Sequence, residues 1–306
     1  MLKSIARIRK EEFDIFLKEY YLKEIPVIVE GMTEGWEAKE KWNLDYFRNN
    51  YKDTVVPVAY YHIERPEYSK REREYLKLGD VIKNLEDHQE KFDLGTDNET
   101  IRKHCYVVGW DIESKNPELL NQINMDEPHF IKNWIDRLPK SVRLPHTDLF
   151  IGSSYSSTPL HTDSFFVNPM LTVIFGRKKI RIISHKYTSL VKNGMDIFDE
   201  EIATKITNEG GEIFECDLEA GDMISFPPGW WHAVKNDGIT IAFQNLHVDS
   251  YRFPVFEKEI RNMYEPTLNK LKNLANEAKY EMGSFGPSDF SSYKASGFKE
   301  KKFSRY

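Results

Sequence analysis

Hydrophobic positions in the first half of the chain change between helical and strand-like spacing. Residues 11–22 carry apolar side chains every three or four positions, which predicts an amphipathic helix. Residues 25–29 have the pattern of a short buried strand that ends before Gly31. By the same reasoning we expect helices at 44–51 and 80–92, with Asp80 as a candidate N-cap, and strands at 54–61 and 105–112. This mixture predicts an α/β N-terminal extension over about residues 1–145.

Residues 149–248 are dense in short strand-like runs separated by turns that contain glycine. Gly176 and the pair Gly221-Asp222 are the clearest turn signals. The candidate strands are 148–153, 157–166, 169–175, 179–184, 211–215, 223–226 and 238–247. Such a series favours a sandwich or barrel of the jelly-roll type. The predicted fold class is mainly β with flanking helices, and its barrel core lies at about 146–250.

Helical spacing returns at residues 254–282, where the apolar positions form one stripe. This stripe could cap the barrel, or it could join two copies of the chain into a homodimer. After Gly283 the sequence turns to glycine, serine, lysine and aromatic residues, which predicts a flexible tail at 283–306. We expect a domain at 1–250, a C-terminal helical segment at 251–282, and this tail.

Charge and composition narrow the function classes. The 306 residues have a formal net charge of -6 and a pI near 5.9, which argues against general nucleic-acid binding because that needs a basic face. The two cysteines, Cys105 and Cys216, form no CxxC motif and indicate neither a disulfide framework nor a thiolate zinc site. No secretion leader and no apolar run of membrane-spanning length stand out. The expectation is a cytoplasmic protein with no nucleic-acid or membrane partner.

Two separated motifs supply a candidate metal site. Residues two apart in a strand lie on the same side, so His161 and Asp163 can bind one ion together. His232 follows the rigid bend Pro227-Pro228-Gly229 in the same strand-rich zone. Each motif alone is weak, because such residues also occur by chance in a chain of this length. Together they predict a two-histidine, one-carboxylate face with open positions, which is typical of non-haem Fe(II) and oxygen chemistry.

Three residues near these motifs have two readings each. Lys178 could hold the carboxylate of a co-reductant as a fixed positive charge, or it could be a solvated residue of the turn Arg177-Lys178-Lys179. Thr158 could add a hydroxyl hydrogen bond, or it could be an ordinary strand threonine. Trp231, next to His232, could form a dry wall of the site or serve only as apolar cover.

The ordered blocks carry a resemblance to a known family. The segments TPLHTD (158–163), FGRKKIRII (175–183) and GDMISFPPGWWH (221–232) resemble the three core blocks of Jumonji C (cupin-like) Fe(II)/2-oxoglutarate oxygenases. The subgroup resembled is the protein hydroxylases similar to the asparaginyl hydroxylase of hypoxia-inducible factor. Residues 25–31, with Trp36 after them, resemble the entry segment of that group. The similarity spans roughly residues 11–248.

The resemblance implies a double-stranded β-helix with Fe(II) on His161, Asp163 and His232. It also implies a site for the cosubstrate 2-oxoglutarate, whose distal carboxylate would bind Lys178. The residues that it assigns to this second site are Lys178, Thr158, Tyr106 and Asn168.

Two positions depart from the family pattern. The spacing from His161 to Gly176 is about two residues longer than in relatives, which makes the match of Asn168 uncertain in register. Gln244 stands where relatives have asparagine, and the resemblance assigns it, with Trp231, to the substrate pocket.

The implied reaction is hydroxylation of a C–H bond in a protein, peptide or amino-acid side chain. It would consume O2 and convert 2-oxoglutarate to succinate, while the protein supplies the ligands, a fixed cation and a dry pocket. On an N-methyl carbon the same steps would demethylate lysine, the less favoured reading because no chromatin-reading module or basic patch is present. Two other readings stay open: a cupin with a 2-oxoglutarate-independent metal activity, and a non-catalytic binding protein on the same scaffold.

Overall fold

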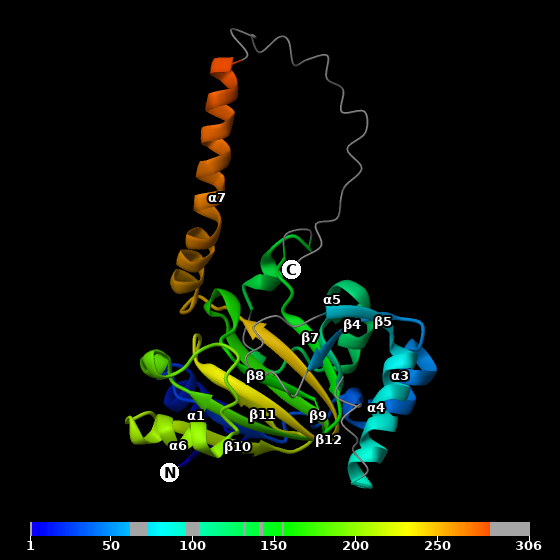
Figure 1. Cartoon of the computed structure of the whole chain (residues 1–306). Coiled ribbons are helices and arrows are strands. Elements are labelled where there is room, and N and C mark those ends of the chain that lie inside the picture. The colour runs from blue at the N-terminus through cyan, green and yellow to red at the C-terminus, as the bar shows by residue number, and fades with distance from the viewer. Residues whose placement is uncertain are drawn as a thin grey trace. The chain divides into compact units, whose positions relative to one another are not determined.

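Twelve strands in the described part of the chain form one hydrogen-bonded sheet system (Figure 1). The computed structural model describes residues 2–61, 73–95, 104–130, 133–140, 143–154 and 156–281. The strands are β1 (Lys3–Ser4), β2 (Ala6–Arg9), β3 (Val27–Glu30), β4 (Val55–Tyr61), β5 (Arg73–Lys77), β6 (His104–Asp111), β7 (Thr147–Gly152), β8 (Ser157–His161), β9 (Asn168–Ile183), β10 (Ile213–Leu218), β11 (Met223–Ser225) and β12 (Trp231–His247). Their main path runs β2-β3-β11-β9-β12-β7-β6-β4-β5.

The helices lie at both ends of the chain and between strands. The α-helices are α1 (Phe13–Ile15), α2 (Glu37–Lys41), α3 (Leu44–Tyr51), α4 (Leu78–Asp93), α5 (Ile112–Lys115), α6 (Glu200–Asn208) and α7 (Phe253–Glu281). The 3-10 segments are η2 (Pro117–Gln122), η3 (Pro128–Phe130), η4 (Ile135–Arg137), η6 (Ser164–Phe166) and η7 (His185–Leu190), and η1 (Phe16–Tyr21) is a π-helix. Among the described residues, no helix is long and apolar enough to cross a membrane.

Two long antiparallel strands, β9 and β12, make the barrel. Each contributes its two halves to different sheets: Met170 to Thr172 of β9 pair with β11, whereas Lys178 to Ile183 pair with β10. β12 follows β9 along both halves, from Trp231 opposite Ile183 to His247 opposite Asn168. The predicted jelly-roll core is confirmed, but the expected strands 169–175 and 179–184 are one strand that bends at Gly176.

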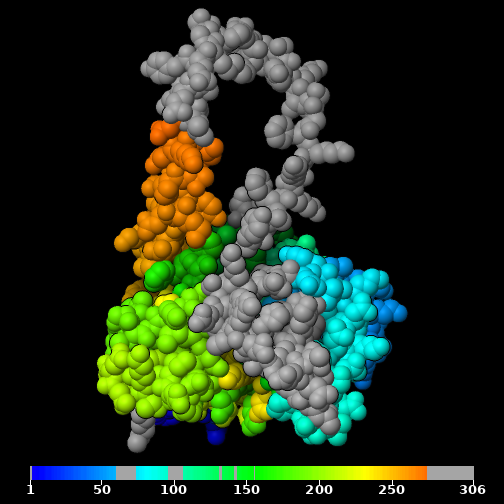
Figure 2. Space-filling view, viewed as in Figure 1, coloured from blue at the N-terminus to red at the C-terminus, as the bar shows by residue number. Residues whose placement is uncertain are grey.

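Three apolar clusters separate the inside of the barrel from its two outer faces. The lumen, which we define as the space between the two sheets, holds a cluster that includes Val173, Ile180, Ile182, Ile224, Phe226 and Val234. The face of the larger sheet away from the lumen packs against the N-terminal helices, through a cluster that includes Phe16, Trp36, Phe47, Leu85, Met170 and Phe243. The outer face of the smaller sheet packs against α6, through Leu160, Ile183, Ala203, Ile206, Ile213 and Ala233. In the space-filling view, α4 (cyan) and α6 (yellow-green) lie on opposite flanks of the barrel (Figure 2).

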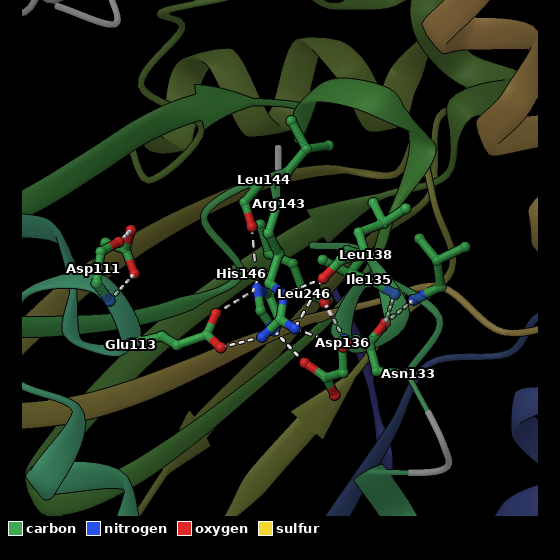
Figure 3. Close-up of polar contacts among 12 residues, drawn as sticks. Asp111, Glu113, Asn133, Ile135, Asp136, Leu138, Arg143, Leu144, His146 and Leu246 are labelled. Atoms are coloured by element: carbon green, nitrogen blue, oxygen red, sulfur yellow. Dashed lines mark hydrogen bonds and ion pairs between the residues drawn. The ribbon is translucent and has the colours of Figure 1, made fainter. Parts of the chain in front are cut away.

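A buried polar network fixes the entry of β7 beside the end of β12 (Figure 3). His146 Nε2 donates to Asp136 Oδ1 at 2.7 Å, and His146 Nδ1 lies 3.8 Å from Glu113, which pairs with Arg143. The carbonyl of His146 accepts from the Leu246 amide at 2.8 Å. Burial alone would lower the pKa of His146, but the hydrogen bond with Asp136 raises it above the usual value. The network therefore holds the strand that follows, β7, in register with β12.

Several predicted elements differ from the structure at their ends. The helix expected at 11–22 is a short α-helix that continues as the π-helix η1. α4 begins earlier than expected, with Lys77 at the N-cap position and Asp80 inside the first turn, so Asp80 is not the cap. The strand expected at 157–166 ends at His161, because Phe165 and Phe166 adopt positive φ angles of 65° and 51°. The pattern gave no sign of α6, whose cap Asp199 accepts from the Ile202 amide at 3.1 Å.

The chain divides into two compact units, residues 1–256 and 257–306. The first contains all the strands listed above. The described part of the second belongs to α7, so the C-terminal helical pattern is confirmed as one helix. The predicted tail at 283–306 lies outside the described residues.

Two glycines at the bends of β9 and β12 offer a matched test of the fold. Gly176 and Gly238 have similar left-handed φ angles of 78° and 76°, but a Cβ on Gly176 would lie 2.0 Å from the carbonyl oxygen of Ile239, whereas one on Gly238 meets nothing within 4 Å. We expect Gly238→Ala to lower the free energy of unfolding by about 1 kcal/mol through its φ angle alone. Gly176→Ala should cost about 3 kcal/mol or more, because the backbone must also shift. Urea denaturation of both variants measures this; equal losses would contradict the close packing of the bend.

Candidate functional site

Three side chains from two strands converge at one end of the lumen. His161 closes β8 and lies directly opposite His232 near the start of β12, and their ring centroids are 4.1 Å apart. Asp163 follows β8 and places its carboxylate oxygens 3.9 Å from His161 Nε2 and 3.8 Å from His232 Nε2. One potential ligand atom from each residue lies within 4.8 Å of the others. Among the described residues, this is the group of histidine, cysteine and carboxylate side chains that can hold a metal ion.

Backbone carbonyls fix the orientation of both imidazole rings. His161 Nδ1 lies 2.9 Å from the carbonyl oxygen of Pro159, and His232 Nδ1 lies 3.2 Å from that of Trp230. A carbonyl oxygen only accepts, so each Nδ1 carries the proton and donates it. Each Nε2 then lies on the side of the ring that faces Asp163, which is how proteins usually prepare histidine ligands for a metal.

The donor set fits a divalent ion. Asp163 Oδ2 is buried and has no hydrogen-bond partner among the described residues, although a buried carboxylate oxygen needs one. A cation bound by the two Nε2 atoms would satisfy that oxygen. Two imidazole nitrogens and one carboxylate on the same side leave other positions open, which is the arrangement of non-haem Fe(II) sites.

A β-bulge brings Thr158 to the same face as His161. Residues three apart in a regular strand point to opposite sides. The register of β8 shifts, however, so that Thr158 lies opposite Val234 while His161 lies opposite His232. The extra residue is taken up at Pro159 and Leu160, and Leu160 packs outside the barrel. Thr158 is 7% exposed and lies between the metal-binding triad and the next polar group of the lumen.

That next group is Lys178, which the structure buries, so of its two readings the solvated turn residue is wrong. It is 1% exposed, and its Nζ donates to Asn236 Oδ1 at 2.5 Å and to Tyr106 Oη at 3.3 Å. Burial lowers the pKa of Lys178 to about 7, and no described carboxylate offsets the effect. An anion that entered the lumen would restore the charged form.

The spacing along β12 relates Lys178 to the triad. His232, Val234 and Asn236 share one face of β12, and their partners on β9 are Ile182, Ile180 and Lys178. Four residues of strand correspond to about 13 Å. A lysine side chain and a five-carbon dicarboxylate can span this distance together. The wall between the two ends is apolar, with Phe226 packed 4.8 Å from the His232 ring.

A family model described as a cupin-like domain matches residues 13–251 of the chain. This protein belongs to the cupin-like domain family. The match covers the N-terminal helices and the whole barrel.

Known proteins with related sequences include several oxygenases. The chain is 26% identical to lysine-specific demethylase JMJ21 of Arabidopsis thaliana, with 82% of this chain and 26% of that protein covered. It is 21% identical to the 2-oxoglutarate and iron-dependent oxygenase JMJD4 of Gallus gallus, with 80% of this chain and 60% of that protein covered. It is 22% identical to the bifunctional arginine demethylase and lysyl-hydroxylase psr-1 of Caenorhabditis briggsae, with 87% of this chain and 67% of that protein covered. The chain thus spans from about a quarter to two thirds of the length of these relatives, and the predicted likeness to the asparaginyl hydroxylase stays a prediction.

Asn168 of the cupin-like domain does not face the lumen. It shares the face of β9 with Met170 and Ile174, which pack under the N-terminal helices. Its Nδ2 donates to Ser225 Oγ at 3.1 Å. The position of Asn168 therefore does not support the predicted contact with 2-oxoglutarate. The turn at Phe165 and Phe166 sets which residues of β9 face the lumen, and Asn168 lies on the other face.

The two predicted substrate-pocket residues lie in different places. Trp231 precedes His232 in β12, so its side chain lies on the opposite face of the strand, packs with the α6 cluster and donates to Thr188 Oγ1 at 3.0 Å. It does not line the lumen. Gln244 lies opposite Leu171, a half-buried neighbour of the lumen cluster, so it faces inward.

No role was predicted for Asn236, whose Oδ1 contacts Lys178 in the structure. A signal was available, because Asn236 is four residues after His232 in one strand and must share its face.

Metal binding tests the convergence of the triad. We expect the protein to bind one Co(II) or Fe(II) ion under anaerobic conditions. His161→Ala, Asp163→Asn and His232→Ala should each weaken binding on the order of 100-fold or more, because each removes a ligand. His185→Ala, on an exposed histidine, is the matched control. Calorimetry and the cobalt absorption spectrum measure the affinity; a triad variant that binds like the control would contradict the site.

Proposed function

We propose that this domain is an Fe(II)/2-oxoglutarate-dependent oxygenase that hydroxylates a C–H bond of a protein, peptide or amino-acid side chain, with O2 as oxidant and succinate as coproduct. The observation that carries the proposal is that the triad and a buried, uncompensated lysine occupy one face of one lumen. The relatives named as 2-oxoglutarate and iron-dependent oxygenases support it.

In this proposal the two ends of the lumen bind different parts of the reaction centre: one end binds the iron, and the other binds the distal carboxylate of 2-oxoglutarate. His161, Asp163 and His232 would hold the iron, which when bound supplies the chemistry that activates oxygen with 2-oxoglutarate as the source of two electrons. Lys178, helped by the Tyr106 hydroxyl, would bind the distal carboxylate as a point charge. Thr158 lies between them and would donate its hydroxyl to the same cosubstrate. The apolar wall of Ile180, Ile182 and Phe226 would exclude water.

Demethylation is the second candidate function. It needs the same residues, since hydroxylation of an N-methyl carbon leads to loss of formaldehyde. The names of relatives favour it, because they include lysine and arginine demethylases. The substrate would be a protein or peptide in either case, bound at the end of the lumen near Gln244.

We also propose that the oxygenase activity belongs to residues 1–250 and is cytoplasmic. Residues 251–282 would then be an appended helical segment.

A cosubstrate assay tests the proposed function. The protein, loaded with Fe(II), should convert 2-oxoglutarate to succinate, and mass spectrometry of a candidate peptide library should show a gain of one oxygen or the loss of a methyl group. Lys178→Ala should weaken 2-oxoglutarate binding roughly 100-fold, because it removes a buried charged hydrogen-bond donor.

The control for this assay is the neighbouring lysine. Lys179 points to the other face of β9, is 43% exposed, and lies 3.9 Å from Glu215. Lys179→Ala should leave 2-oxoglutarate binding within about twofold of the unchanged protein. Equal behaviour of the two lysine variants would favour a metal-dependent activity without 2-oxoglutarate, or a binding role.

We also propose that α7 joins two copies of the chain. Tyr264, Leu268 and Leu271 recur at helical spacing and are 48%, 51% and 57% exposed. An apolar stripe of this kind on a helix needs a partner surface.

Light scattering tests the dimer. We expect a mass twice that of the 36.1 kDa chain at micromolar concentration. The double variant Leu268→Asp/Leu271→Asp should be monomeric because it places charges in the apolar stripe, whereas Asn269→Asp on the same helix should stay dimeric. A single-chain mass for the unchanged protein would exclude this role of α7.

A further inference from the structure

The amide of Asn236 is oriented by Lys178. An ammonium group only donates, so the Asn236 atom 2.5 Å from Lys178 Nζ must be the oxygen. The other end of the amide, Nδ2, is then directed away from Lys178. Asn236 is 6% exposed, and its Nδ2 is buried with no hydrogen-bond partner in the part of the chain that the structure describes. A buried NH2 group in this state is costly unless an acceptor arrives.

The absence of a side chain at Gly152 in β7 leaves room for the amide of Asn236. Gly152 lies on the lumen face of β7, two residues after Phe150. A Cβ at Gly152 would lie 2.2 Å from Asn236 Nδ2 and 2.7 Å from the Tyr106 ring. The amide of Asn236 therefore lies against the backbone of β7 at a place that any side chain at residue 152 would block.

The three hydrogen-bond donors Lys178, Tyr106 and Asn236 together match a carboxylate. Lys178 offers an ammonium, Tyr106 a hydroxyl and Asn236 an NH2 group, and among the described residues no carboxylate offsets the burial of Lys178. Nitrogen donors from two different side chains can each take one oxygen of a carboxylate. A hydroxyl or a neutral carbonyl ligand would leave one of these donors unmatched.

We propose that Asn236 and Lys178 bind the same carboxylate of the cosubstrate: Asn236 Oδ1 holds the lysine ammonium, and Asn236 Nδ2 donates to the second carboxylate oxygen. This rests on the proposed function. Asn236 is thus a binding residue for the distal end of 2-oxoglutarate, and Gly152 is the residue that makes space for it.

Ligands of two lengths test the proposal without turnover. The protein is loaded with Mn(II) under anaerobic conditions, and the dissociation constants of 2-oxoglutarate and oxalate are measured by calorimetry. Oxalate can chelate the metal but has no distal carboxylate. We expect Asn236→Ala to weaken 2-oxoglutarate on the order of tenfold or more and oxalate less than about twofold. Asn236→Asp should weaken 2-oxoglutarate further, because its charge neutralises Lys178 and repels the ligand.

Matched variants separate this role from a structural one. Asn208→Ala, on an exposed face of α6, is the control and should change neither constant. Gly152→Ala should push the Asn236 amide aside and reproduce the selective loss for 2-oxoglutarate. The proposal is overturned if Asn236→Ala weakens both ligands equally, or if Asn236→Asp binds 2-oxoglutarate like the unchanged protein.

The failure of this inference can be told from failure of the proposed function. If Lys178→Ala loses 2-oxoglutarate while the Asn236 and Gly152 variants keep it, the inference is wrong and the function stands. If Lys178→Ala also keeps full affinity for 2-oxoglutarate, the proposed function itself is wrong.

Discussion

The antiparallel pairing of β9 with β12 determines where the chemistry of this domain lies. Both strands bend at glycines and continue from one sheet into the other, so one ladder of hydrogen bonds builds both walls of the lumen. Side chains alternate between the two faces along each regular stretch of this ladder. A shift of one residue would turn His232 and Asn236 outward and bring Trp231 in. The packing of apolar side chains on three separate faces keeps that shift from occurring, and the site depends on the same forces that hold the barrel together.

The metal-binding part of the site could be predicted from the sequence because its ligands depend on local rules. Residues two apart in a strand share a face, and a histidine after a rigid proline-rich bend in the same strand-rich zone can meet them. The strands of the barrel were also predictable from glycine-marked turns. The sequence left two readings for Lys178, since a lysine in a short basic turn is usually solvated. Only the strand partners decide between them: Lys178 lies opposite Asn236 inside the barrel.

The placement of Asn168 and Thr158 relative to the lumen depends on strand phase, which local sequence does not determine. Asn168 could not be placed because Phe165 and Phe166 adopt left-handed angles that reset the alternation before β9 begins. Thr158 reaches the lumen only through a bulge at Pro159. The outward orientation of the Trp231 side chain could have been predicted, because Trp231 is adjacent to His232 in a strand and so must face the other way. In each case the chemical type of the residue suggested a role, and its position on the ladder decided whether it could perform it.

Charge balance explains why both ends of the lumen keep groups that the protein alone does not satisfy. In the described part of the chain, a buried oxygen of Asp163 has no hydrogen-bond partner, and no carboxylate offsets the burial of Lys178. Neither arrangement stabilises the fold, because burying an uncompensated charge costs free energy. A divalent ion with one carboxylate ligand carries one net positive charge, and a protonated Lys178 adds a second. A dicarboxylate carries two negative charges, and its length allows it to meet both. With the proposed Fe(II) and 2-oxoglutarate as ligands, the charges of the lumen would balance only when both are bound, so each should strengthen the binding of the other.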